Sequence, residues 1–310
     1  MKHSCVCAST ALLAVFLALA GCRQTPPYGE TDGTTDTSAT AETLAYQGDF
    51  EGPLGLQLWS VRRAMRQDVP GTLQKVHDWG FREVELAGTY GMSARQFRQL
   101  LDSTGLNATS MHVSYELMRD SLDKVLNQAE TLGVRYVGVP WLPHPEGQPL
   151  TVAEAHEIAA NFNTWGRAAR DRGLTFFYHT HGYEFVPDES GAVPFDVLMK
   201  ETEPDLVTYQ LDVFHVALPG QDPAALLRKY PDRWQLLHLK DLKKGVPTTD
   251  QSGAAPASEM VPVGSGQIDW PEVLRTAQEV GVKEYYVEDE SDDPMNNIPA
   301  SIHYMETVAY

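Results

Sequence analysis

Cysteine is almost missing from this 310-residue sequence, which contains only Cys5, Cys7 and Cys22. Everything after residue 22 can therefore form no disulfide and offers no thiol for catalysis. Positive charge is also scarce, because 24 lysine and arginine residues face 42 aspartate and glutamate residues, which gives a formal net charge of −18. There is no strongly basic patch and no internal repeat. An acidic surface repels phosphate backbones, which argues against nucleic acid as a partner and favours small neutral or cationic molecules.

The sequence has no apolar run long enough to span a bilayer comfortably. Its one candidate, residues 8–20, follows the basic residues Lys2 and His3, which is the pattern of an export signal. Leu19-Ala20-Gly21-Cys22 resembles a bacterial lipobox, which implies a lipoprotein signal over residues 1–22 and lipid on Cys22. An ordinary signal peptide with a chance cysteine is the alternative. Arg23, by resemblance to Gram-negative lipoproteins, favours the outer membrane, so we expect a cell-envelope protein that contacts the membrane only through its lipid and faces the periplasm.

Residues 23–50 are polar and threonine-rich and contain almost nothing to bury. We interpret them as a disordered linker between the lipid anchor and a folded domain. The remaining residues, 51–310, are enough for one large α/β domain, and (β/α)8 barrels commonly have this size.

Predicted strands and helices alternate along this domain. An alternating pattern implies a parallel sheet, and eight such units favour closure into a single-domain (β/α)8 barrel, or TIM barrel. The strands are expected at 54–59, 82–86, 106–113, 134–140, 174–178, 207–211, 234–237 and 284–287, and the helices at 69–79, 93–103, 117–132, 151–172, 223–230, 270–280 and 297–308.

Each of the last four predicted strands ends in side chains that can bind a metal ion. A parallel strand covered on both faces is a continuous apolar run, and a charge at its end needs a partner because burying an unpaired carboxylate is costly. We interpret the four strand ends as one shared site for a divalent cation at the C-terminal rim of the barrel. The side chains are His179, His181 and Glu184 after the fifth strand, Asp212 and His215 after the sixth, His238, Lys240 and Asp241 after the seventh, and Glu288 after the eighth.

A long loop, residues 243–266, follows the seventh strand and is rich in glycine, proline, alanine and serine. Loops of this length in compact domains are usually lids, binding loops or disordered segments. Two interpretations of this loop remain open: a mobile cover over the site, or a flexible insertion without function.

Several motifs occur in the order and strand positions of a known family. They are GLQLWSVR at 55–62, VELAG at 84–88, YHTHGYEF at 178–185, LDVFH at 211–215, HLKD at 238–241, VGSGQIDW at 263–270 and VE at 287–288. With these motifs the domain resembles the xylose isomerase-like TIM barrels, the sugar phosphate isomerase/epimerase superfamily, from about residue 54 onward. That resemblance implies the same barrel fold.

The resemblance also implies one divalent metal ion as cofactor, bound by Glu184, Asp212, His238 and Glu288. Three carboxylates and one imidazole favour Mn²⁺ or Mg²⁺, with Co²⁺ or Zn²⁺ as alternatives. His181 is the alternative ligand from the fifth strand. His179 and His181 alternate along an extended segment and should point to the same face, and we expect His181 to lie nearer the metal.

Other side chains near these strand ends are candidates for substrate contacts. Lys240 is expected to act in catalysis by polarising a carbonyl group or binding a substrate oxygen; an ion pair with Asp241 or Glu288 is the alternative. The predicted substrate-binding residues are Glu85, His112, His181 and His215. For Glu85 and His112, which end the second and third strands, simple packing remains an alternative.

The resemblance implies a metal-dependent sugar isomerase or epimerase. Glu184 and Glu288 would move a proton next to a sugar carbonyl, one on each face of the sugar, through a metal-bound enediolate. The same first step on a 3-keto glycoside would make the enzyme a lyase or hydratase instead. A non-catalytic lipoprotein that binds sugar is a further alternative. The partner in each case is a small sugar or glycoside.

Overall fold

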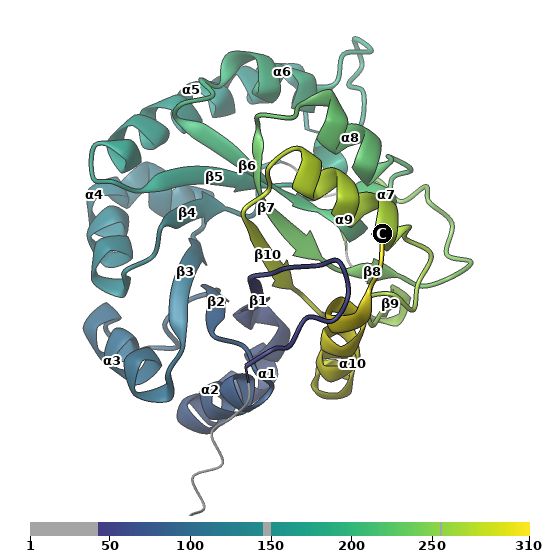
Figure 1. Cartoon of the computed structure of the whole chain (residues 1–310). Coiled ribbons are helices and arrows are strands. Elements are labelled where there is room, and N and C mark those ends of the chain that lie inside the picture. The colour runs from purple at the N-terminus through teal and green to yellow at the C-terminus, as the bar shows by residue number, and fades with distance from the viewer. Residues whose placement is uncertain (1–42, 145–149, 255) are drawn as a thin grey trace, which may run out of the picture. The chain divides into compact units, whose positions relative to one another are not determined.

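The computed structural model describes residues 43–144, 150–254 and 256–310. The predicted signal peptide, Cys22 and most of the predicted linker lie outside these residues. Eight parallel strands close into a barrel in the order β1-β10-β7-β6-β5-β4-β3-β2, with helices around the outside (Figure 1). The predicted (β/α)8 barrel is therefore confirmed.

The elements lie close to their predicted positions. The barrel strands are β1 (Leu54–Gln57), β2 (Glu83–Leu86), β3 (Asn107–His112), β4 (Tyr136–Val139), β5 (Thr175–His179), β6 (Val207–Asp212), β7 (Trp234–Leu239) and β10 (Glu284–Val287). The helices are α1 (Arg62–Met65), α2 (Val69–Asp78), α3 (Ala94–Thr104), α4 (Tyr115–Leu132), α5 (Val152–Arg170), α6 (Pro194–Glu201), α7 (Val213–Ala217), α8 (Pro223–Lys229), α9 (Trp270–Glu279) and α10 (Pro294–Thr307). None of the helices in the described ranges is long and apolar enough to cross a membrane.

The helix starts follow local capping chemistry. The Ser93 side chain accepts a hydrogen bond from the Gln96 amide at the start of α3. The Gln96 side chain accepts one from the Ser93 amide, and the two bonds make a capping box. Thr151 and Glu154 do the same at α5. The longest of the helices that the sequence patterns did not predict is α6, which has eight residues and begins after Val193 without any side-chain cap. A short helix without a polar N-cap lacks the signal on which sequence prediction depends.

The barrel interior has an apolar floor. Tyr136, Phe177, Leu236 and Tyr286 form a separate buried cluster there. Gly55 makes room for Tyr286, since a Cβ at that position would lie 2.6 Å from its ring. Inward-facing side chains recur at every second residue of a strand, so the next positions along β5, β7 and β10 are His179, His238 and Glu288. The same alternation that builds the apolar floor thus places the polar residues above it.

The last residues of the predicted linker pack against the barrel. The amides of Gln47 and Gly48 donate to the Glu306 carbonyl at the end of α10, and the Asp49 amide donates to the Val308 carbonyl. Phe50 is buried, with its ring 5.1 Å from that of Tyr285. The folded part of the chain therefore begins several residues before position 51.

The loop 243–266 is tied down at its base. β8 (Asp241–Leu242) pairs antiparallel with β9 (Met260–Val261). The Asp241 carboxylate accepts hydrogen bonds from the amides of Gly264 and Gly266 and from the Trp270 indole. The tip folds back as well, since a Cβ on Gly253 would meet the Tyr183 ring at 2.5 Å. Asp241 thus serves the loop and does not pair with Lys240.

Candidate active site

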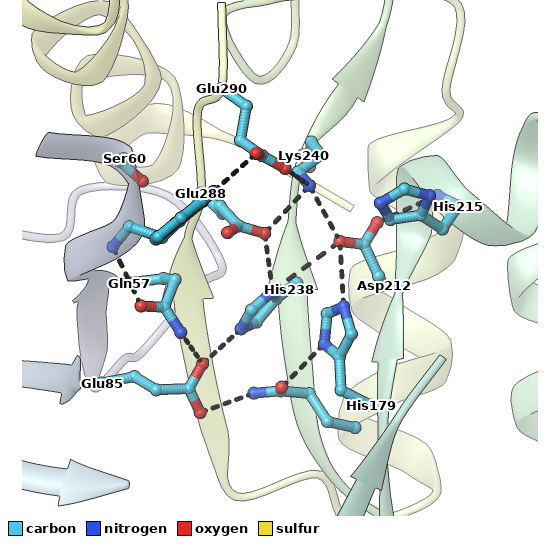
Figure 2. A network of polar contacts seen from close by, with 12 residues as sticks. Gln57, Ser60, Glu85, His179, Asp212, His215, His238, Lys240, Glu288 and Glu290 are labelled. Atoms are coloured by element: carbon cyan, nitrogen blue, oxygen red, sulfur yellow. Dashed lines mark hydrogen bonds and ion pairs between the residues drawn. The ribbon is translucent and has the colours of Figure 1, made fainter. Parts of the chain in front are cut away.

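Three of the predicted metal ligands meet at the C-terminal end of the barrel (Figure 2). Asp212, His238 and Glu288 are buried, and one ligand atom of each lies within 4.8 Å of the others. His238 Nδ1 is 3.0 Å from Glu288 Oε2 and 3.7 Å from Asp212 Oδ2. They come from β7, β10 and β6, whose register places His238 beside Asp212. Such spacings suit atoms that each bind one ion at about 2.0–2.2 Å.

Glu85 holds His238 from the other side. His238 Nε2 lies 2.5 Å from Glu85 Oε1, and Glu85 also accepts hydrogen bonds from Gln57 and Ser110. Burial alone would raise the pKa of Glu85, but His112 and His238 outweigh it and lower that pKa to about 2. In the neutral imidazole, a proton on Nε2 leaves the Nδ1 lone pair facing Asp212 and Glu288, which is how a carboxylate orients a metal-binding histidine. Glu85 was expected to bind substrate. It is fully buried, however, and its place is to position His238.

Gln210 fixes the protonation of two more histidines. Its amide nitrogen donates to Glu85, so its oxygen is left to accept from His112 Nε2 at 2.9 Å and from His179 Nδ1 at 2.8 Å. Burial, together with His238, lowers the pKa of His179 well below its usual range, so the ring is neutral. With the proton on Nδ1, the Nε2 lone pair of His179 faces Asp212 Oδ2 across 3.8 Å.

This pair of acceptors is the observation that fits a metal ion. Asp212 Oδ2 is buried and accepts no hydrogen bond from the part of the chain that the structure describes. Two buried acceptors facing each other are unfavourable unless a cation lies between them. The surrounding charge agrees, because the carboxylates of Glu85, Asp212, Glu288 and Glu290 gather around two cations, Lys240 and Arg62. Burial alone would lower the pKa of His238, but Glu85 and Glu288 outweigh it and raise that pKa well above its usual range. A divalent ion would take the place of the proton on His238 Nδ1 and would neutralise the two negative charges that remain.

Lys240 lies at the centre of the carboxylates. Its Nζ is 2.9 Å from Glu288 Oε2, 2.9 Å from Glu290 Oε1 and 3.4 Å from Asp212 Oδ2. Burial disfavours its charge, but Asp212 and Glu288 raise the pKa of Lys240 well above its usual range. The same contact works in the other direction on Asp212, whose pKa burial alone would raise but Lys240 and His215 lower well below its usual range. Lys240 is therefore a fixed positive charge beside Glu288.

Glu184, the fourth predicted ligand, is not part of this group. It lies on the 3₁₀ helix η2 (Tyr183–Phe185), is fully buried, and accepts a hydrogen bond from the His181 amide at 2.9 Å. Its other oxygen has no hydrogen-bond partner among the described residues. Burial raises the pKa of Glu184 to about 7, and none of the groups that shift it belongs to the metal cluster. The geometry supports neither a ligand nor a base at this position.

The histidine of β5 that lies beside the cluster is His179, whose Nε2 is 3.8 Å from Asp212 Oδ2. His179 is grouped with His112 and His238, with one nitrogen of each within 4.8 Å of the others. His181 lies farther out, where its ring is 4.5 Å from that of His215. Both have a buried Nδ1 without a partner in the described ranges. Burial, opposed mainly by Asp212, lowers the pKa of His215 to about 4.

A cavity of about 420 Å³ opens above the cluster. His112, His179, His181 and Glu288 line it. Substrate contacts by His112 and His181 stay a prediction. Two exposed tryptophans, Trp59 and Trp141, line it as well. His215 does not line this cavity. Glu288 therefore belongs both to the ligand cluster and to the cavity wall.

Comparison with known proteins agrees with this architecture. The family described as Xylose isomerase-like TIM barrel matches residues 73–308. This chain belongs to that family. Inosose dehydratase from Lacticaseibacillus casei is 24% identical over 245 residues, which cover 71% of this chain and 81% of the relative. A sugar phosphate isomerase/epimerase structure from Parabacteroides distasonis has a TM-score of 0.67 at 25% identity and covers 88% of this chain and 98% of that chain.

Two more distant structures share the xylose isomerase-like fold. The 3-keto-D-glucoside 4-epimerase from E. coli has a TM-score of 0.60 at 16% identity, covering 82% of this chain and 99% of that one. The IolI protein with a bound zinc atom has a TM-score of 0.61 at 15% identity, covering 82% and 95%. The relatives are isomerases, epimerases and dehydratases, so the prediction of an enzyme of the isomerase, epimerase or lyase kind is confirmed.

Several residues of the site were not predicted from the sequence of this xylose isomerase-like barrel. Gln57, Ser110 and Gln210 lie one to three residues before the predicted strand ends, where the strand pattern alone assigns them no role. A buried polar residue in an apolar strand is itself a signal, because it needs a hydrogen-bond partner. His179 is the last residue of β5. A residue inside a strand has a fixed facing, so its position predicts whether it reaches the barrel centre better than the position of a loop residue does.

Proposed function

We propose that this protein is a metal-dependent lyase. It would remove a proton next to the carbonyl group of a cyclic keto sugar or related keto polyol, and would eliminate the oxygen substituent on the neighbouring carbon. The observation that carries the proposal is that Glu288 is the one carboxylate that both joins the ligand cluster and lines the cavity, among the residues that the structure describes. Glu184, which would supply a second base, lies outside the cluster.

The residues that would hold the ion are His179, Asp212, His238 and Glu288. Two imidazoles and two carboxylates contain more nitrogen than the predicted set, which favours Zn²⁺, Co²⁺ or Mn²⁺ over Mg²⁺. When bound, the ion would act as a Lewis acid on the carbonyl oxygen of the substrate.

One base is sufficient for elimination. Glu288 would take the proton from the carbon beside the carbonyl group, and the electron pair of the broken C–H bond would form a carbon–carbon double bond. The C–O bond on the next carbon would break, and Glu288 would return the proton to the departing oxygen. Lys240, held 2.9 Å from Glu288, would stabilise the negative charge that develops on the substrate. The similarity to inosose dehydratases supports this outcome over epimerisation.

Epimerisation is the second candidate, because one group across the cavity could return the proton to the other face. His112 lies on β3, lines the cavity, and is neutral because burial lowers its pKa. The similarity to a sugar phosphate isomerase/epimerase supports this alternative.

Turnover in deuterium oxide tests the shared first step and separates the outcomes. The metal-loaded protein is incubated with free ketoses, keto polyols and 3-keto glycosides, and the products are identified by mass and NMR. A lyase gives an unsaturated product or a released aglycone, and an epimerase gives an isomer with deuterium at the inverted carbon. Glu288→Gln should abolish exchange at carbon, whereas Glu184→Gln, the matched control, should retain it. Turnover that gives neither an unsaturated product or released aglycone nor an isomer with deuterium at the inverted carbon excludes both forms of the proposal.

We also propose that the enzyme is an outer-membrane lipoprotein anchored through Cys22. The basic start, the apolar run and the Leu19–Cys22 pattern support this location. An enzyme in the envelope would meet glycosides more readily than cytoplasmic sugar phosphates.

A further inference from the structure

We infer that the substrate is an uncharged glycoside whose second group stacks between Trp59 and Trp141, outside the ring that reacts. This inference rests on the proposed function, since it names the group that the keto ring carries. Trp59 and Trp141 are 39% and 44% exposed, and with Leu117 they are the large apolar side chains that remain exposed in the described part of the chain. Both line the cavity that holds Glu288.

The two rings approach the cavity from different sides. Trp59 lies on the 3₁₀ helix η1 (Leu58–Val61), directly after β1, and Trp141 follows β4. β2 and β3 separate these strands in the barrel, and Ala87 directly after β2 and His112 at the end of β3 also line the cavity. A flat group that enters the cavity would therefore have an indole on each side.

Both indoles are held in place by their neighbours. Trp59 Nε1 donates to Glu290 Oε2 at 2.7 Å, and the Arg62 guanidinium lies 4.8 Å from the ring centre. Because its polar atom is already paired, the exposed part of Trp59 is hydrocarbon. Trp141 stacks on His144 and contacts the edges of His181 and Tyr183, with ring centres 4.9–5.2 Å apart. Aromatic faces that are fixed before binding cost little conformational entropy, and they carry the negative potential that C–H groups and other rings prefer.

The size of the cavity agrees with a substrate larger than one sugar ring. Its volume of about 420 Å³ lies within the ~300–1,000 Å³ of pockets that hold drug-sized ligands. The reacting ring would lie next to Glu288 and His179, and the remaining volume extends to the tryptophans.

Charge argues against a phosphorylated substrate. The cavity wall contains Glu116, Glu288 and Glu290, and it contains no lysine or arginine among the described residues. Glu116 lies in the first turn of α4, where a helix would otherwise attract an anion. A phosphate group on the second ring would meet carboxylates in a wall to which no described lysine or arginine contributes, and therefore the second group should be neutral.

The test uses ordinary glucosides, which carry no ketone and so bind without turnover. Titration calorimetry compares phenyl glucoside, methyl glucoside and glucose 6-phosphate, with both anomers of each glucoside, on the full protein. In the wild type the phenyl glucoside of one anomer should bind about 4- to 100-fold more tightly than the methyl glucoside, which is about 2- to 10-fold for each indole. Trp59→Ala and Trp141→Ala should each reduce this preference, Trp59→Phe and Trp141→Phe should retain part of it, and Leu117→Ala, an exposed apolar residue outside the cavity wall, should keep it.

Three results would overturn the inference: equal affinity of phenyl and methyl glucosides in the wild type, a preference unchanged in both alanine variants, or tightest binding of glucose 6-phosphate. Circular dichroism and the melting temperature show whether each variant is folded, and the phenylalanine variants carry the test if the alanine variants are not. The two proposals can fail separately. If the glucosides bind as expected but no 3-keto glycoside is turned over, the proposed elimination from glycosides is refuted and the aromatic binding site is still supported.

Discussion

Glu85 and His238 are 153 positions apart in the sequence, yet Glu85 Oε1 lies 2.5 Å from His238 Nε2, and both side chains are fully buried. β2 and β7 lie on different sides of the barrel, so this contact crosses the barrel interior. It connects the polar network of Gln57, Ser110 and Gln210 to the ligand cluster. The carboxylate orients the imidazole whose other nitrogen faces Asp212 and Glu288.

Replacement of Glu85 by glutamine should weaken metal binding without removing any ligand. A glutamine amide can donate to His238 Nε2 or accept from it, so it no longer fixes the proton there. Loss of such a hydrogen-bond partner typically costs about 10–100-fold in metal affinity. Competition with a fluorescent chelator measures the affinity. Ser110→Ala, which removes a different partner of Glu85, is the control and should change it far less; equal affinities of wild type and Glu85→Gln would show that Glu85 does not orient His238.

The strand-5 ligand is tested by two single variants. His179→Ala should lower metal affinity by more than the loss of a hydrogen-bond partner does, since it removes a donor whose lone pair faces Asp212. His238→Ala and Asp212→Asn should have comparable effects. Glu184→Gln should bind metal as the wild type does, because Glu184 lies outside the cluster. Elemental analysis after dialysis gives the occupancy, and full occupancy in His179→Ala with loss in Glu184→Gln would reverse the assignment.

The barrel and much of its rim follow from the sequence, and the reasons are local. Apolar runs end in charged residues at Asp212, His238 and Glu288, and a residue inside a strand keeps its facing through the two-residue period. Glu288 follows β10 directly, but residues several positions beyond a strand end have no such period. Gly182 has a φ of 98°, which L side chains rarely adopt, and the turn that it makes directs Glu184 away from the barrel centre. The sequence pattern could not show this turn, so Glu184 lies apart from Asp212, His238 and Glu288, which the structure brings together as the pattern predicts. That these three bind a metal stays a prediction.

Asp241 is expected to hold the loop 243–266 in place. Its carboxylate accepts hydrogen bonds from two backbone amides and from the buried Trp270 indole, and Asp241→Ala would leave these donors without that partner. The unpaired buried indole alone costs roughly 1–3 kcal/mol. The loop should then be cut by protease at concentrations that leave the wild type intact. Asp250→Ala, at the exposed tip, is the matched control, and identical digestion of wild type and Asp241→Ala would show that other contacts hold the loop.

The lipid anchor is tested with two cysteine variants. Cys22→Ser should leave a folded domain that partitions into the aqueous phase on detergent separation, whereas the wild type should enter the detergent phase. Cys5→Ser should behave as the wild type, because Cys5 lies within the predicted signal. A wild type that partitions with Cys22→Ser would refute the lipobox interpretation.

Glu184 makes the stability of the protein depend on pH. Its pKa rises from 4.5 to about 7 in the folded state, because the carboxylate is buried with one oxygen unpaired. The folded state then binds more protons than the unfolded state between these two values, so the free energy of unfolding falls as pH rises through this window. Below about pH 4.5 both states are protonated, and above about pH 7 the full cost is present, on the order of 3 kcal/mol at ~1.4 kcal/mol for each pH unit.

Glu184→Gln cannot ionise. Its amide can still accept from the His181 amide and can donate toward the Tyr178 hydroxyl, which lacks a partner among the described residues. The variant should therefore gain stability over the wild type as pH rises from 5 to 8, as measured by urea unfolding at several pH values. A difference between the two proteins that stays constant over this range would mean that Glu184 is ionised in the folded protein at pH 5 and that its burial does not carry the predicted cost.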